Sequence, residues 1–285
     1  MLAIHLNISG NPKPETRNPT MALRDLFING GGGPLIDSHG HLGPFCGIFM
    51  PEAALERMVA GMDRCNVESI LLSPHNALSG DTREGNKEML EAVRRYPGRV
   101  YGYCTINPSF VEDIEAEMNA YLGLPGVVGI KIHPSMHSYA VDGPNYQPVW
   151  ERANRDKWIV LSHTWGADGG CGANDMRKIA ERCPDVRLIL GHSCYGAWDK
   201  AIRLAAEFPN VYIELTAAYH VYGIIEWMCR EAGSEKVLFG TDYPWFDPMV
   251  AAGCVVFAHI EQNEMLNILY KNARRLIDEQ AARWK

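Results

Sequence analysis

The stretch LIDSHGHLGP (residues 35–44) places a short apolar run directly before two histidines that are one residue apart. It is the first of eight apolar runs that recur along the chain, and their repetition decides the fold. The runs are LID (35–37), SILLS (69–73), VYGYCTI (100–106), VVGIKI (127–132), WIVLS (158–162), VRLILG (186–191), VYIEL (211–215) and KVLFG (236–240). Short, mostly apolar runs of this kind are typical of strands that are buried on both faces of a sheet.

Amphipathic stretches separate these runs, for example GNKEMLEAVRRYP (85–97) and WDKAIRLAAEFP (198–209). Several begin at Pro, Ser or Asn and end just before Pro, as helices do. Strands that alternate with helices predict parallel pairing, and eight such units in 285 residues predict a single α/β domain, a (β/α)₈ TIM-like barrel over residues 34–285. A doubly wound open sheet is the alternative, but DSHGHLG after the first run does not match the GxGxxG phosphate loop of that fold.

Residues 1–33 differ in composition from the rest of the chain. The first twenty are polar and rich in Pro and Asn, and NGGGG follows at 29–33. We expect a flexible N-terminal extension here. Neither an internal repeat nor a second domain is apparent in the sequence.

The composition excludes several classes of function. A formal net charge of −7 offers no basic surface for nucleic acid or an anionic membrane, and we find no apolar run of about 18 residues that would span a bilayer. The first twenty residues lack the pattern of a secretory signal. The eight cysteines form no CxxC pair, so we expect reduced thiols and a cytoplasmic location.

Polar residues gather where the predicted strands end. Eight of the ten histidines fall there, together with Lys131, Glu214 and Asp242: His39, His41, His75, His133, His137, His163, His192 and His220. The carboxyl ends of the strands form the active site of a barrel, so this clustering predicts a site rather than a random scatter of imidazoles.

Four of these residues form a predicted metal site. His39 and His41 project to the same side of a strand, and His163 and Asp242 complete a set of nitrogen and oxygen ligands. The set suits one divalent ion, best Zn²⁺, although Mn²⁺, Fe²⁺ or Co²⁺ would also fit. Each residue has an ordinary alternative: a polar turn for the His-x-His pair, a hydrogen-bonded core histidine for His163, and a helix cap for Asp242.

Two catalytic roles and one substrate surface follow from this arrangement. Asp242 would move a proton while it binds the metal, and His192 would orient water or polarise the substrate, with a role as a direct ligand as its alternative. The residues expected to contact substrate are Lys131, His133, Trp165 and Tyr243. Lys131 would hold a substrate carboxylate, pair with another group inside the barrel, or, if carbamylated, bridge two metals. The aromatic residues, Trp245 included, would wall the substrate or shield the metal, and Glu214 is expected to partner a histidine.

The motifs IDSHGH, GIKIHP, LSHTWG, LILGHSCYG, LFGTDYPW and NARRL together resemble the metal-dependent amidohydrolase superfamily. More narrowly, the chain is similar to the amidohydrolase-related branch that includes aminocarboxymuconate semialdehyde decarboxylase. The resemblance implies a distorted barrel with one divalent metal, the same four ligands, a catalytic role for His192, and a homo-oligomer, a dimer or higher. One departure is GHSCYGAW after the sixth run, where many relatives have glycines, and it leaves the pocket wall there undefined.

The leading functional hypothesis is a hydrolase that uses metal-activated water on an amide, ester or lactone of a small molecule. The alternative is a nonoxidative decarboxylase of a small, possibly aromatic, acid. Both use the same ligands, so the motifs do not separate them. A barrel that binds without catalysis and a metal-free lactonase are further alternatives from other classes.

Overall fold

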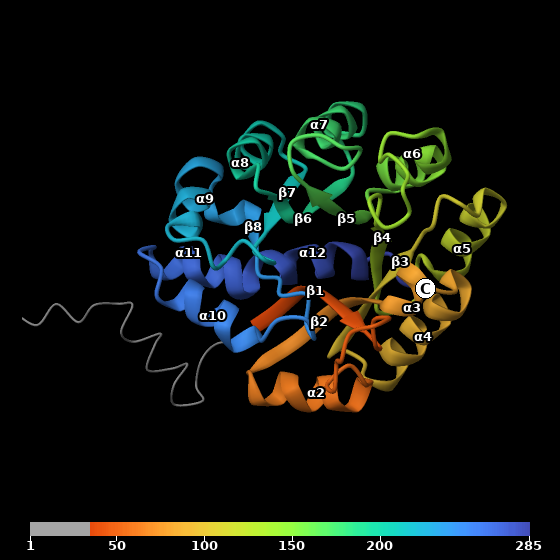
Figure 1. Cartoon of the computed structure of the whole chain (residues 1–285), viewed down its shortest axis with the longest axis horizontal. Coiled ribbons are helices and arrows are strands. Elements are labelled where there is room, and N and C mark those ends of the chain that lie inside the picture. The colour runs from red at the N-terminus through yellow and green to blue at the C-terminus, as the bar shows by residue number, and fades with distance from the viewer. Residues whose placement is uncertain (1–34) are drawn as a thin grey trace, which may run out of the picture.

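The computed structural model describes residues 35–285, so the predicted extension at 1–33 lies outside the described residues. Its centre is an eight-stranded parallel sheet in the order β1 to β8, with helices around it (Figure 1). The strands are β1 Leu35–Leu42, β2 Val67–Pro74, β3 Val100–Thr105, β4 Val127–Ile132, β5 Ile159–Trp165, β6 Arg187–Tyr195, β7 Val211–Glu214 and β8 Val237–Leu238. The predicted (β/α)₈ barrel is confirmed.

Helices follow the strands and cover the outside of the barrel (Figure 1). They are α2 Leu55–Arg64, α3 His75–Ser79, α4 Thr82–Arg95, α5 Ile114–Tyr121, α6 Gln147–Asp156, α7 Ala173–Arg182, α8 Trp198–Glu207, α9 Ile224–Ala232, α10 Pro248–Val256, α11 Gln262–Leu266 and α12 Asn272–Ala281. Asp81 caps α4 by accepting from two backbone N–H groups, as an N-cap aspartate does. The helices bury their apolar faces against the outer side of the sheet.

Hydrogen bonds between β1 and the segment after β8 close the barrel. The amide of Ser38 donates to the carbonyl of Phe239 at 2.9 Å, and the amide of Asp242 donates to the carbonyl of His39 at 2.7 Å. The amide of His41 donates in turn to the carbonyl of Tyr243 at 2.8 Å. Closure of the barrel therefore places Asp242 beside the two histidines of β1.

The C-terminal helix α12 closes the amino end of the barrel. Its Leu276 and Ile277 join a buried cluster of residues from inside the strands, and the helix lies across the middle of the ring in Figure 1. Beyond it, the indole N–H of Trp284 donates to the carbonyl of Val127, the first residue of β4, at 3.0 Å. The opposite, carboxyl end is left for the site.

Three strands extend several residues beyond their apolar runs, and one of them is β5, which continues through His163 to Trp165. β1 continues to Leu42, so His39 and His41 lie within the strand rather than after it, and β6 continues through His192 to Tyr195. The reason is pairing: His41 remains in register with Ser73 of β2, and Tyr195 pairs with Trp165 of β5. Apolar runs mark only the part of a strand that packs in the core.

Two further predictions from the sequence concern membrane-spanning segments and disulfides. None of the helices in residues 35–285 is long and apolar enough to cross a membrane. All eight cysteines lie in this part of the chain and none is in a disulfide.

The close approach of β4 to β5 predicts a specific cost for a side chain at Gly129. A Cβ there would lie 2.3 Å from the carbonyl oxygen of Ile159, which belongs to the sheet backbone and cannot move freely. We expect Gly129→Ala to lower the free energy of unfolding by about 1–3 kcal/mol. Gly253→Ala, where a Cβ in α10 would meet nothing within 4 Å, is the matched control. It should raise stability by about 0.5–1 kcal/mol. Urea unfolding of both variants tests this, and equal effects would contradict it.

Candidate metal centre

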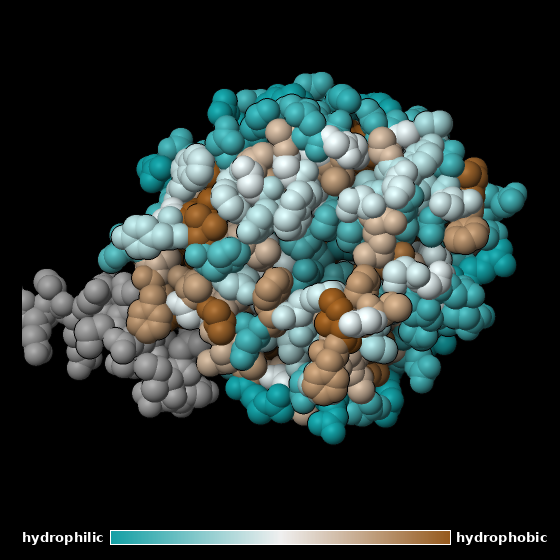
Figure 2. Space-filling view, viewed as in Figure 1, coloured by the Kyte–Doolittle hydropathy of each residue, from teal (hydrophilic) through white to brown (hydrophobic). Residues whose placement is uncertain are grey.

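A cavity of about 290 Å³ opens at the carboxyl ends of the strands. Figure 2 shows a hollow near the centre of the molecule, with hydrophilic residues inside it and apolar residues among those on its rim. The residues that line the cavity are His39, His41, Phe45, His75, Leu78, Lys131, His133, Met136, His163, Trp165, His192, Asp242, Trp245 and Phe246. Most of the predicted site residues therefore meet in one place.

His39 and His41 point into this cavity because alternate residues of a strand share a face. Each ring is held at its Nδ1. The Nδ1 of His39 lies 3.2 Å from Oε1 of Glu214, and the Nδ1 of His41 lies 3.0 Å from the carbonyl oxygen of Ser73. A carbonyl and a carboxylate only accept, so each Nδ1 carries the hydrogen and each Nε2 is left with a lone pair. This is how metal-binding histidines are held by a second layer of groups.

The carboxylate of Asp242 faces both lone pairs. Its Oδ1 lies 3.1 Å from Nε2 of His39 and 3.2 Å from Nε2 of His41, and it has no hydrogen-bond partner although it is buried. Three acceptors that converge in this way repel one another. The ammonium of Lys131, 2.8 Å from Nε2 of His39, offsets part of this repulsion, and a cation among the three atoms would offset the rest. The donor set of two imidazoles and a carboxylate fits a divalent metal ion.

Asp242 also has a strained backbone. Its φ of 61° lies in the left-handed region, which a residue with a side chain rarely adopts. Strain of this kind persists only where surrounding contacts hold it, and it is frequent at functional sites. The backbone N–H of Asp242 donates a hydrogen bond to the carbonyl of His39, and that of the preceding Thr241 donates to the carboxylate of Asp37. These two hydrogen bonds hold the segment in place.

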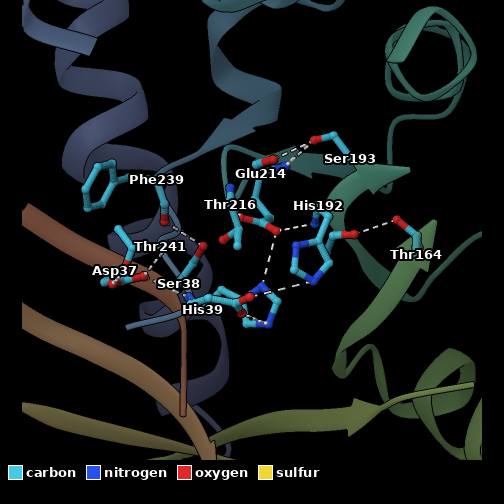
Figure 3. A network of polar contacts seen from close by, with 12 residues as sticks. Asp37, Ser38, His39, Thr164, His192, Ser193, Glu214, Thr216, Phe239 and Thr241 are labelled. Carbon is cyan, nitrogen blue, oxygen red and sulfur yellow. Dashed lines mark hydrogen bonds and ion pairs between the residues drawn. The ribbon is translucent and has the colours of Figure 1, made fainter. Parts of the chain in front are cut away.

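Glu214 links the first histidine to a second strained segment (Figure 3). Its Oε1 accepts from Nδ1 of His39 and from the backbone N–H of His192, while its Oε2 accepts from the amide of Thr216 at 2.7 Å. The predicted role of Glu214 as a histidine's partner is therefore observed. One buried carboxylate positions groups from β1 and β6 at once.

The backbone at residues 192–194 is left-handed at three successive positions, with φ values of 63°, 48° and 53°. Two side chains hold this turn. The hydroxyl of Ser193 donates to the carbonyl of Glu214 at 2.5 Å, and the hydroxyl oxygen of Thr164 accepts from the amide of Cys194 at 2.8 Å. These bonds direct the ring of His192 toward Asp242.

His192 and His163 lie next to each other at the edge of this group. The Nε2 of His192 is 4.0 Å from Oδ2 of Asp242, and His39, His192 and Asp242 each offer a ligand atom within 4.8 Å of the others. The ring of His163 is 4.7 Å from that of His192 and stacks on His133 at 3.9 Å. Whether His163 or His192 is the further ligand stays a prediction, as first made for His163.

Burial keeps these rings neutral. It lowers the pKa of His192 to about 4, and burial beside His192 lowers the pKa of His163 to about 2. Burial, reinforced by Lys131, also holds the pKa of His39 well below its ordinary value. Neutral imidazole is the form that binds a metal.

Lys131 is the single cationic side chain among the described residues that line the cavity. It is fully buried, and its Nζ lies 2.8 Å from Nε2 of His39. Burial lowers its pKa to about 8, so the amine still carries a charge at neutral pH. The position suits the predicted contact with an anionic substrate.

Tyr243 does not line the cavity, and this corrects the expectation that it contacts substrate. Asp242 faces the cavity, whereas the ring of Tyr243 is buried in the hydrophobic core outside it. Its hydroxyl would lie only 2.1 Å from a Cβ at Gly61 of α2. Trp245, two residues further on, faces the cavity instead, whereas His133 and Trp165 line it as expected. Phe45 and Met136 also line the cavity, and the sequence does not predict this because their loops carry no pattern that indicates orientation.

Comparison with known proteins now identifies the family. The sequence profile of the family described as amidohydrolase matches residues 36–278. The chain belongs to this amidohydrolase family. The resemblance seen in the motifs is confirmed.

Two of the similar proteins are named as decarboxylases of aromatic acids, and a third is uncharacterized. Gamma-resorcylate decarboxylase of Rhodococcus jostii (strain RHA1) is 23% identical in an alignment 279 residues long; the match covers 75% of this chain and 84% of that protein. A dihydroxybenzoic acid decarboxylase from Polaromonas sp. JS666, solved with manganese and the inhibitor 2-nitroresorcinol, has a TM-score of 0.67 at 18% identity, over 87% of this chain and 97% of that one. An uncharacterized TIM-barrel protein from Bordetella bronchiseptica has a TM-score of 0.74 at 19% identity, over 88% and 100%.

The convergence of acceptors predicts that Asp242→Asn abolishes tight metal binding without unfolding the protein. The amide would donate to an Nε2 that the carboxylate can only repel, so we expect the metal-free variant to melt no lower than wild type. Its affinity for Mn²⁺ should fall by about 100-fold or more, because loss even of a ligand's outer partner costs roughly 10–100-fold. Calorimetric titration of the metal-free proteins measures this.

Asp247→Asn is the matched control for that titration. Asp247 caps α10 five residues further on, and asparagine caps equally well. Affinity for Mn²⁺ should be unchanged in this variant. Equal affinity in the Asp242 and Asp247 variants would remove Asp242 from the ligand set.

Proposed function

We propose that this amidohydrolase-family protein is a metal-dependent decarboxylase that removes CO₂ from a small aromatic acid. This is the alternative that the sequence left open, rather than the hydrolase that it favoured. The observation that carries the proposal is the cavity itself, in which aromatic and apolar side chains surround one cluster of metal ligands and one buried ammonium group. The decarboxylases of aromatic acids among its relatives support the same choice.

The metal would be held by His39, His41 and Asp242, with His163 or His192 as a further ligand. A bound divalent cation would supply positive charge that attracts the carboxylate, or a hydroxyl beside it, and stabilises negative charge on the substrate. Imidazole and carboxylate ligands bind both Zn²⁺, the ion expected from the sequence, and Mn²⁺, the ion in the structure of the Polaromonas decarboxylase.

The protein's own groups would hold the anion and move the proton. The ammonium of Lys131 would pair with the acid or its hydroxyl. When the bond between the ring and the carboxylate breaks, its electron pair stays on the ring carbon, which then takes up one proton as CO₂ leaves. The proton comes from water, and we assign its relay to the ring carbon to Asp242 and His192, whose Oδ2 and Nε2 lie 4.0 Å apart.

Release of CO₂ from hydroxybenzoic acids by the Mn²⁺- or Zn²⁺-loaded protein tests the proposal directly. We expect turnover of at least one single-ring acid, and His192→Gln should lower kcat by about 10²–10⁴-fold, the usual contribution of a positioned acid or base. Hydrolysis of lactones, esters or amides without any CO₂ release would overturn the proposal in favour of the hydrolase.

The role of Lys131 gives a separate prediction. Lys131→Met keeps the length and apolar stem of the side chain but removes the charge, so it should raise KM for an aromatic acid by about 10-fold or more, since a charge-assisted hydrogen bond contributes roughly 1.5–3 kcal/mol. Lys178→Met, at an exposed lysine of α7, is the control and should leave KM unchanged. A fall in bound metal from two ions to one in the Lys131 variant would instead support carbamylation.

A further inference from the structure

His75 and Trp245 form a hydrogen bond that the reaction proposed above does not use. The indole N–H of Trp245 lies 2.8 Å from Nε2 of His75. An indole N–H only donates, so this Nε2 must accept. The hydrogen of the ring is therefore on Nδ1, which donates to the carbonyl of Gly43 at 2.6 Å. Both nitrogens of His75 are thus bonded within the protein, and neither is free for a substrate.

Three rings from separate parts of the chain pack around this bond. Phe45 follows β1, His75 begins α3 after β2, and Trp245 follows β8. Phe45 contacts the other two rings at centroid distances of 5.3 Å, and the rings of His75 and Trp245 are 5.8 Å apart in an edge-to-face arrangement. All three line the cavity, and we call them the aromatic wall.

The aromatic wall is fixed relative to the metal ligands. His75 is 2% exposed and stacks on His41 with ring centroids 4.8 Å apart and an angle of 25° between the planes. A side chain bonded at both nitrogens and packed on a ligand has little freedom to turn. Trp245, bonded to it, is held in the same frame.

We propose that His75 is a positioning residue that holds Trp245 as part of the wall against which the substrate ring packs. The inference rests on the proposed function, in which a small aromatic acid enters this cavity. Because the indole N–H is already bonded to His75, the wall offers the substrate ring surface and no free donor. A hydroxyl or carboxyl group directed at the wall would lose its hydrogen bonds to water without gaining others. The ring edge that faces the wall must therefore be apolar, and the polar substituents lie on the edge near Lys131 and Asp242.

Fluorine NMR of protein labelled with 5-fluorotryptophan tests the positioning role without any substrate. Trp245→Phe assigns the Trp245 signal. We expect His75→Leu to shift or broaden that signal, and His75→Gln, whose amide oxygen can accept from the indole, to restore it. His220→Leu, at an exposed histidine outside the cavity lining, is the control. An unchanged Trp245 signal in His75→Leu would overturn the proposal.

A double-mutant cycle tests whether His75 acts through Trp245. The probe is 2-nitroresorcinol, titrated calorimetrically into the Mn²⁺-loaded protein. His75→Leu and Trp245→Phe should each weaken binding by about tenfold, the effect of losing roughly 1.4 kcal/mol. The double variant should bind within about twofold of the weaker single variant, because residues that act together are not additive. Additive losses would overturn the proposal.

The two tests separate the inference from the proposed function. If the Trp245 signal responds as expected but neither 2-nitroresorcinol nor any hydroxybenzoic acid binds the wild type, the proposed function fails and the substrate role of the wall fails with it. If the wild type binds the probe but His75→Leu binds equally well, the proposed function stands and the role of His75 is wrong.

Discussion

Two imidazole nitrogens and one carboxylate oxygen, all acceptors, face one another at 3.1 and 3.2 Å in the carboxyl end of this barrel. The arrangement exists because Glu214 and the carbonyl of Ser73 each accept a hydrogen bond from the Nδ1 of a histidine. The Nε2 lone pair of each ring therefore points into the cavity. Burial prevents water from relieving the conflict among these acceptors. The Lys131 ammonium, 2.8 Å from Nε2 of His39, offsets part of this repulsion, and the proposed divalent cation would offset the rest.

Closure of the barrel and construction of the site depend on the same contacts. The backbone hydrogen bond from the amide of Asp242 to the carbonyl of His39 joins the segment after the last strand to the first strand. It also sets the distance between these two predicted metal ligands. Glu214 does the equivalent between β1 and β6, where its Oε1 binds the ring of His39 and the amide of His192. Hydrogen bonds between neighbouring strands hold the strained backbone at Asp242 and at residues 192–194. The predicted metal-binding side chains are therefore in position before a metal ion or a substrate binds.

The sequence was sufficient to predict the barrel, because eight apolar runs alternate with amphipathic helices, and to predict the group of histidines, because side chains at strand ends of a barrel must meet. It was not sufficient to predict how far β1, β5 and β6 extend, since the residues after their apolar runs are mostly polar and their pairing depends on neighbouring strands. Nor could it distinguish Tyr243 from Trp245, because orientation after β8 depends on contacts with β1. The bond between His75 and Trp245 joins residues 170 positions apart, and no local pattern indicates it.

The most direct test of the account is anomalous X-ray diffraction from crystals of the protein grown with Mn²⁺. We expect one strong anomalous peak within bonding distance of Nε2 of His39, Nε2 of His41 and a carboxylate oxygen of Asp242. The same map would show whether His163 or His192 is the further ligand. The absence of a peak among these three atoms, with manganese found only on surface carboxylates, would contradict the claim that the converging acceptors form a metal site.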